Sequence, residues 1–139
     1  MAIADSPRDI LARSRTIAVV GASRDPGKPG HGVPEQLRRF GFRIIPVNPN
    51  ASGTLFGEPV RASLLDVGEP VDLVDVFRPA ADAPEIARQA VAIGAGALWL
   101  QDGIISAEAR RIAAAAGMDY VEDRCTGVER ALGQLAWSG

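Results

Sequence analysis

The sequence predicts an α/β domain in which a parallel sheet of about five strands carries helices on both faces. A short β-branched run at residues 16–20 is followed by a glycine-rich loop, and strand-like runs then alternate with helical runs. This alternation predicts βαβ units with right-handed crossovers, which make neighbouring strands parallel. The 139 residues contain no repeat, low-complexity run or linker. We therefore expect a single domain over residues 1–139, with residues 1–15 as an N-terminal helical extension.

The first strand, loop and helix form the segment around which the rest of the chain is arranged. Residues 16–20 read Thr-Ile-Ala-Val-Val, which predicts a short buried strand. Residues 21–30 contain three glycines and two prolines, which break both helix and strand, so we expect an irregular loop there. Val33 and Leu37 then recur at helical spacing and predict a helix.

A strand, a glycine-rich loop and a helix in this order direct backbone N–H groups and the positive end of a helix dipole at one point. Such a point suits an anion, above all a phosphate. Arg24 and Lys28 lie inside the loop, and a basic loop is a stronger phosphate signal than glycine alone. The alternative is a tight βα turn whose charges are merely solvated.

The remaining elements follow in alternation. Strands are expected at residues 42–47, 71–77, 97–100 and 120–121. Helices are expected after Ser6-Pro7, around residues 64–65, and at residues 81–93, 107–116 and 128–135, with an irregular polar segment at residues 51–59. Asp72 and Asp75 interrupt the third strand, which indicates either a sheet edge or a polar contact for these carboxyls.

Polar or turn-forming residues follow every expected strand. The five strand tips carry Gly21-Ala22-Ser23-Arg24, Asn48-Pro49-Asn50, Arg78-Pro79, Gln101-Asp102-Gly103 and Asp123-Arg124-Cys125. In an open parallel sheet, ligands bind beyond the carboxyl ends of the strands. Five such tips on one edge predict a ligand crevice there.

The obvious ligand for such a crevice is a dinucleotide, and two features argue against NAD. The loop lacks the G-x-G-x-x-G pattern, because Ser23 and Pro26 stand where the second and third glycines would be. The second strand ends in Asn48 and not in the acid that binds the ribose hydroxyls of NAD. A neutral residue there tolerates a phosphate on the ribose, as in NADP or coenzyme A, and Arg24 and Lys28 are suitable countercharges.

Composition excludes several other classes. A net charge of -2 gives no electrostatic basis for nucleic-acid binding. No apolar run approaches the about 20 residues that span a bilayer, so we expect no membrane contact. The single cysteine rules out an internal disulfide and favours a cytoplasmic location. One histidine and one cysteine also argue against a structural zinc site, so we expect no metal.

Five short motifs in this order carry a family resemblance. They are Val20-Gly21-Ala22-Ser23-Arg24, Pro46-Val47-Asn48-Pro49, Val76-Phe77-Arg78-Pro79, Leu98-Trp99-Leu100-Gln101-Asp102-Gly103-Ile104 and Asp123-Arg124-Cys125. Together they resemble the single-domain bacterial CoA-binding proteins of the YccU type. Those proteins are similar in turn to the N-terminal CoA-binding domain of the succinyl-CoA synthetase alpha subunit. The resemblance runs from about residue 16 to residue 135.

The resemblance implies a Rossmann-like domain that holds coenzyme A, or an acyl-CoA, across the strand tips. The residues that it implies are Gly21, Ala22, Ser23 and Arg24, with Lys28, for the phosphates; Pro46, Val47 and Asn48 for the adenosine end; Val76, Phe77 and Arg78 where nucleotide and pantetheine pass; and Leu100, Gln101 and Asp102 for the pantetheine arm. The synthetase also uses a second domain with a phosphorylated histidine, which we expect this chain to lack. The resemblance therefore implies a binding module with no catalytic residue.

Two alternatives remain open. One is an enzyme, either a small NADP-dependent oxidoreductase or a CoA-transferring enzyme, for which Cys125, Asp102 and His31 are the available reactive groups. The other is a protein-interaction module with a vestigial nucleotide site, although the sequence indicates no particular protein partner.

Each reactive group also has an ordinary structural explanation. Cys125 follows Arg124, a cation that can lower a thiol pKa, but a small half-buried residue is the commoner role for a free cysteine. Asp102 and Asp123 lie on neighbouring tips and would form a carboxylate pair if they met, or else cap helices. His31 stands near a helix start, where a capping or solvent-facing role is usual.

Overall fold

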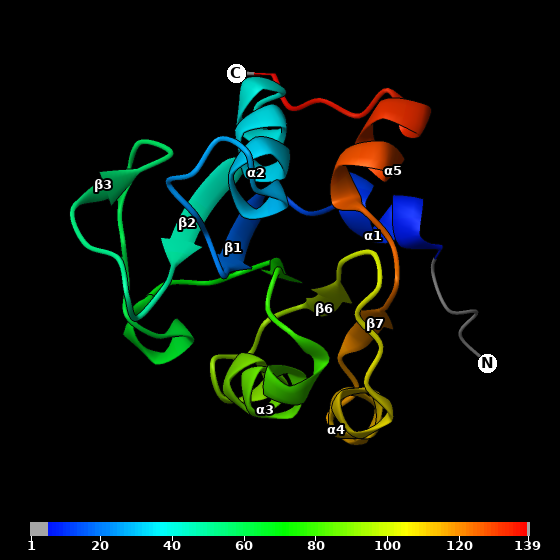
Figure 1. Ribbon diagram of the computed structural model, residues 1–139. Helices are drawn as coiled ribbons and strands as arrows, with labels where there is room; N and C mark the ends of the chain where they lie inside the picture. The colour runs from blue at the N-terminus through cyan, green and yellow to red at the C-terminus, as the bar shows by residue number, and fades with distance from the viewer. Residues whose placement is uncertain (1–5, 139) are drawn as a thin grey trace.

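The computed structural model of the protein describes residues 6–138. Five parallel strands form one sheet in the order β2-β1-β5-β6-β7. The strands are β1 (Thr16–Val20), β2 (Arg43–Val47), β5 (Leu73–Val76), β6 (Ala97–Leu100) and β7 (Asp119–Val121). The predicted fold class, a Rossmann-like parallel sheet between helical layers, is confirmed (Figure 1).

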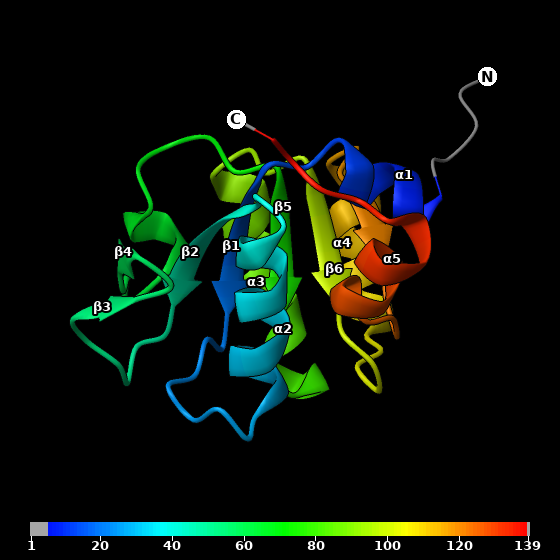
Figure 2. The same cartoon turned by 90° about the horizontal axis from the view of Figure 1, so that it is seen from above.

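Helices cover both faces of the sheet, as Figures 1 and 2 show. One layer contains α1 (Pro7–Ala12), α2 (Pro29–Arg39) and α5 (Thr126–Gly133), and the other contains α3 (Ala83–Ala92) and α4 (Ala107–Ala115). Because side chains alternate along a strand, each sheet face has its own core. Ile17, Val19 and Trp99 pack in the core on the α1 and α2 side, and Ala18 and Leu98 pack on the α3 and α4 side.

The chain reverses its direction across the sheet between β1 and β5. Strand β1 lies between β2 and β5, so the chain passes from β1 through α2 to β2 and later returns to the other side of β1. The loop after β1 leads to α2 on one face, and the loop after β5 leads to α3 on the other. Figure 2 shows the loop between β1 and α2 extending beyond the carboxyl ends of the strands. Diverging loops of this kind open a crevice between them.

Three local expectations differ from the structure. Helix α2 begins at Pro29, inside the predicted loop, because proline is favoured in the first turn, where its missing N–H needs no acceptor. The predicted irregular segment contains a hairpin of β3 (Thr54–Leu55) and β4 (Glu58–Pro59), whose turn uses the positive φ of Phe56 (55°) and Gly57 (78°). Helix α5 begins at Thr126, two residues earlier than predicted.

The shorter elements complete the fold. The expected helix around residues 64–65 is the 3-10 turn η1 (Leu64–Asp66), and a second turn, η2 (Ala80–Asp82), leads into α3. The predicted start of α1 is confirmed, because the Ser6 hydroxyl accepts a hydrogen bond from the Asp9 amide at 3.1 Å. Within residues 6–138, no helix combines the length and hydrophobicity needed to cross a bilayer.

Candidate functional site

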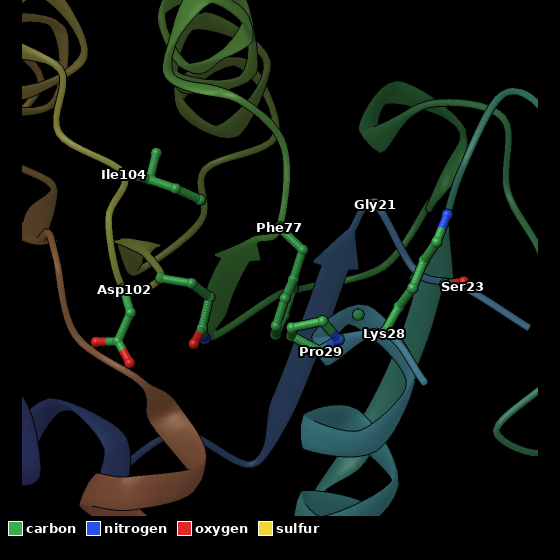
Figure 3. Close-up of a pocket in the computed structure, with 9 residues that line it drawn as sticks. Gly21, Ser23, Lys28, Pro29, Phe77, Asp102 and Ile104 are labelled. Carbon is green, nitrogen blue, oxygen red and sulfur yellow. The ribbon is translucent and has the colours of Figure 1, made fainter. Parts of the chain in front are cut away.

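A cavity of about 230 Å³ lies where the loops after β1, β5 and β6 meet the first turn of α2. We call it the small cavity. Its lining residues are Gly21, Ser23, Lys28, Pro29, Gly30, Phe77, Gln101, Asp102 and Ile104. Figure 3 shows Lys28 and Ser23 on one side and Asp102 and Ile104 on the other, with Phe77 and Pro29 between them. The small cavity thus combines apolar walls with polar groups at its two ends.

Close backbone approach explains the glycines of the small cavity. Gly21 has φ of 92°, and a Cβ there would lie 3.0 Å from the carbonyl oxygen of Phe77. A Cβ on Gly30 would lie 2.5 Å from the carbonyl oxygen of Gly21, which is shorter than any van der Waals contact. Only glycine lets the β1 loop, the β5 tip and the start of α2 meet at this point.

The first turn of α2 makes one side of the small cavity electropositive. The N-cap residue is Lys28, and its side chain makes no capping hydrogen bond, so the N-cap side chain does not occupy the backbone N–H groups of this helix end. Pro29 and Gly30 of the first turn line the cavity beside Lys28. The positive end of the helix dipole and the Lys28 charge both favour an anion here.

A second cavity, of about 440 Å³, lies on the other side of the β1–β5 boundary, between the tips of β1 and β2 and the start of α3. We call it the large cavity. Its lining residues are Val20, Gly21, Val47, Asn48, Pro49, Asn50, Ala62, Ser63, Arg78, Ala81, Asp82, Glu85, Ile86 and Gln89. Gly21 lines both cavities. The two cavities therefore meet at the glycine that ends β1.

Charge in the large cavity comes from the exposed Arg78–Asp82 ion pair and from Glu85, which pairs with Arg88. The Arg78 guanidinium donates to the Asp82 carboxylate at 2.9 Å, and both side chains are almost half exposed. Exposed pairs contribute at most about 1 kcal/mol, so an incoming anion can replace the carboxylate at little cost. Arg78 is consequently available to a ligand in the large cavity.

Asn48 fixes the tip of β2 against the β1 loop. Its side-chain nitrogen donates to the carbonyl oxygen of Ala22 at 2.9 Å, and its side-chain oxygen accepts from the Asn50 amide at 2.8 Å. Asn48 lines the large cavity, but its hydrogen bonds are those of a structural residue. No acidic side chain takes this place at the end of β2.

The remaining predicted site residues lie at the edge of the two cavities or behind their walls. Arg24 is exposed, but its guanidinium donates to the carbonyl oxygens of Thr54, at 2.9 Å, and Ser52, and it lines neither cavity. The buried predicted residues are Pro46, Val76 and Leu100 in the strands and Ala22 in the loop after β1. The sequence placed these residues at the strand tips. It did not show which of them face a cavity.

Beneath the small cavity lies a buried ring of three polar side chains, Asp75, Gln101 and Thr126. Gln101 Nε2 donates to both Asp75 Oδ1 and Thr126 Oγ1, and the Thr126 hydroxyl donates to Asp75 Oδ2 at 2.8 Å. Asp75 and Thr126 are fully buried, and Gln101 is 6% exposed. Since β5 is the middle strand, the sheet-edge explanation for Asp75 is wrong and the polar-contact explanation is right.

Burial dominates the electrostatics of this ring. It raises the pKa of the Asp75 carboxyl from an ordinary 3.8 to about 7, against the opposing effect of the hydrogen bonds from Gln101 and Thr126. A charged carboxylate in an apolar layer is costly, and two donors offset part of that cost.

The three reactive groups of the enzyme alternative are not brought together. His31 Nδ1 contacts the carbonyl oxygen of Ser23 at 2.7 Å and so holds the loop, and Cys125 is the N-cap residue of α5; neither lines a cavity. Burial raises the pKa of the Cys125 thiol, and the Asp102 and Asp75 charges raise it as well, so an activated thiolate is not favoured. Asp123 accepts from the Gly103 amide at 2.7 Å.

Sequence reasoning missed several residues of the site. Gly30 was read only as a chain breaker, and Ser63 and Gln89 of the large cavity carried no signal, because they come from segments outside the strand tips. Asp75 did carry one, a carboxyl inside a β-branched strand. Within residues 6–138, no group of three or more His, Cys, Asp or Glu side chains is placed to hold a metal ion.

Known proteins share this arrangement. The family model described as a CoA binding domain matches residues 15–131. The uncharacterized protein YneT of Bacillus subtilis is 34% identical over 125 residues, which cover 90% of this chain and 92% of that protein. The ADP-forming acetate–CoA ligase I of Archaeoglobus fulgidus is 32% identical over 126 residues, which cover 82% of this chain but 18% of the ligase.

Solved structures agree with the sequence matches. The protein named cell-free ID.343 from Thermus thermophilus has a TM-score of 0.86 at 45% identity, covering 90% of this chain and 94% of that one. The dinucleotide-forming acetyl-coenzyme A synthetase 1 of Ca. Korarchaeum cryptofilum has a TM-score of 0.69 at 26% identity, covering 81% of this chain but 26% of that one. The chain thus matches small proteins over nearly their whole length and large synthetases over one region.

Proposed function

The chain belongs to the CoA binding domain family, and from this premise we propose that it binds coenzyme A, free or acylated, at the carboxyl edge of its sheet. One observation carries the proposal. Two cavities of different character meet at Gly21, at the point where the chain reverses across the sheet and α2 begins. A ligand with an anionic centre and two unlike ends fits this arrangement.

The residues of the two cavities fit the parts of coenzyme A. The pyrophosphate lies at Gly21 and the first turn of α2, where Lys28 supplies a cation. The adenosine end lies in the large cavity, where Asn48 leaves room for the ribose phosphate and Arg78 supplies a second cation. The pantetheine arm lies in the small cavity, along Phe77 and other apolar walls.

Binding fits the site better than catalysis does. Of the three reactive groups, Asp102 alone lines a cavity, and it is exposed. The relatives named acetate–CoA ligases match this chain over only a small part of their length, so their ligase activity is not carried over to it. The NADP-dependent oxidoreductase alternative draws little support from the site, because His31 and Cys125 line neither cavity.

Isothermal titration of the purified protein with coenzyme A, acetyl-CoA, NADP and NAD tests the proposal. We expect coenzyme A or acetyl-CoA to saturate one site per chain, and NAD to bind much more weakly because the end of β2 lacks the ribose-binding acid. Tight NAD binding without CoA binding would overturn the proposal. A ligand that co-purifies with the protein, identified by mass spectrometry, would distinguish free from acylated coenzyme A.

A further inference from the structure

The side-chain carbonyl oxygen of Gln101, Oε1, accepts no hydrogen bond from any of residues 6–138. Both hydrogens of the Gln101 amide nitrogen are taken, one by Asp75 Oδ1 and one by Thr126 Oγ1, the latter at 2.8 Å. Over residues 6–138, the only fully enclosed side-chain polar atom without a partner is Arg130 Nε. Gln101 Oε1 is therefore open to the small cavity, which Gln101 lines.

The ring beneath the cavity fixes which end of the amide faces out. In the structure the NH₂ group of Gln101 faces Asp75. Above the pKa of about 7 of Asp75, the carboxylate only accepts hydrogen bonds and therefore requires this orientation. The Thr126 hydroxyl donates its one hydrogen to Asp75 Oδ2 and is thereby left to accept from Gln101. Turning the amide over would set its oxygen against the carboxylate, which is costly in a buried place.

The small cavity therefore presents a preset acceptor between apolar walls. Phe77, Pro29 and Ile104 offer no side-chain donor to Gln101 Oε1. A narrow, mostly apolar chain that carries an N–H group would pack against these walls and donate a hydrogen bond to Gln101 Oε1. The pantetheine arm of coenzyme A is such a chain, because its two secondary amides each carry one N–H.

We propose that Asp75 and Thr126 are positioning residues that hold Gln101 so that its carbonyl oxygen accepts a hydrogen bond from a pantetheine amide N–H. This inference rests on the proposed binding of coenzyme A. It adds a selectivity element to that function, because the acceptor recognises the pantetheine arm and not the nucleotide.

Two ligands separate this contact from the rest of the site. Coenzyme A contains the pantetheine arm, and adenosine 3′,5′-bisphosphate has the adenosine and two of the three phosphates but no arm amide. Their dissociation constants are measured by calorimetry at pH 8, above the pKa of about 7 of Asp75, so that its carboxyl is ionised. The variants are Gln101→Met, which keeps the side-chain length, and Thr126→Val with Thr126→Ser as its matched control.

Because Gln101→Met loses one hydrogen bond to the ligand, we expect it to weaken the binding of coenzyme A about five- to tenfold. The affinity for the bisphosphate should change less than about twofold. Thr126→Val should weaken coenzyme A about threefold, because the amide loses one of its two acceptors, and Thr126→Ser should restore the wild-type value. Thermal melts of each variant establish that the fold is retained.

Three results would overturn the inference. They are an equal loss for both ligands, a Thr126→Ser variant as weak as Thr126→Val, and wild-type coenzyme A affinity in Gln101→Met. If the wild type binds both ligands and the variants show one of these results, only the positioning role fails. If the wild type binds neither ligand, the proposed function fails and the inference fails with it.

Discussion

The two cavities that meet at Gly21 are built in opposite ways. In the small cavity, the Gln101 amide is held by a fully buried carboxyl and hydroxyl. In the large cavity, Arg78 is held by one exposed ion pair. A buried ring tolerates one arrangement of donors and acceptors, whereas an exposed pair adjusts to its ligand. We expect the small cavity to discriminate between ligands and the large cavity to add affinity.

The largest effect should be on stability, and it should come from the Asp75 carboxyl beneath the small cavity. The pKa of Asp75 is raised by burial to about 7, so the folded protein binds this proton more tightly than the unfolded chain. The tighter binding of this proton stabilises the folded protein fully below about pH 4, and the stabilisation is lost as the pH rises through 7. Asp75→Asn has no such proton. The wild type loses this stabilisation between pH 5 and pH 8, and Asp75→Asn does not. The free energy of unfolding of Asp75→Asn, relative to that of the wild type, should therefore rise by about 3 kcal/mol over this range.

Urea denaturation of both proteins at the two pH values measures this difference. Asp102→Asn is the matched control, because Asp102 lines the same cavity but is exposed. A pH-independent difference between Asp75→Asn and wild type would show that burial does not raise the pKa of Asp75.

The next effect tests whether the two cavities depend on one backbone contact. In Gly30→Ala, the new Cβ would lie 2.5 Å from the Gly21 carbonyl oxygen, so the loop must move. We expect a loss of about 1–3 kcal/mol in stability and at least about tenfold weaker binding of both coenzyme A and the bisphosphate.

Gly32→Ala is a control in the same helix, because a Cβ there would meet nothing within 4 Å. It should stabilise the protein by up to about 1 kcal/mol and leave binding unchanged. If Gly30→Ala weakened one ligand and spared the other, the cavities would be independent sites.

A smaller effect, on affinity, should distinguish the Lys28 charge beside the expected phosphates from a positive charge elsewhere on the surface. Lys28→Ala should weaken coenzyme A about tenfold at low salt, because Lys28 is the cation beside the first turn of α2. Arg111→Ala removes the same charge from an exposed position on α4 that lines neither cavity, and should change the affinity less than about twofold. Equal losses in titrations of the two variants would place the phosphates elsewhere.

The smallest effect should come from the large cavity. Arg78→Ala removes an exposed pair, so stability should change by no more than about 0.5 kcal/mol and coenzyme A should weaken about threefold. Calorimetry of Arg78→Ala and Lys28→Ala under the same conditions ranks the two cations. A larger loss for Arg78→Ala would reverse the comparison and make the large cavity the anchoring side.

Elements with a strong local pattern were predicted correctly. The β-branched run at residues 16–20 is β1, and the Ser6 cap begins α1, because strand and cap signals are read within a few residues. The family resemblance drawn from five motifs is likewise confirmed. The predicted start of α2 was wrong, and the predicted irregular segment at residues 51–59 contains the β3–β4 hairpin, because the same glycines and prolines serve loops, helix ends and tight turns.

The candidate site was predicted by region and not by side chain. Gln101, Asp102 and Phe77 line the small cavity as their strand-tip positions predict, although their role in binding stays a prediction. The position of Arg24 beside a phosphate stays a prediction. In the structure its guanidinium donates to the carbonyl oxygens of Ser52 and Thr54, which lie 28 and 30 residues away in sequence. No local pattern encodes such a contact.

The sequence by itself determined the alternating strands and helices, the edge of the sheet that carries polar residues, and the absence of an acid at the end of β2. These features follow from periodicity and residue type, which act over short stretches of chain. The tertiary structure alone decided that Asp75, Gln101 and Thr126 form one ring and that Gly21 joins two cavities. Such contacts join residues that are distant in sequence, and the packing of whole helices against the sheet sets their geometry.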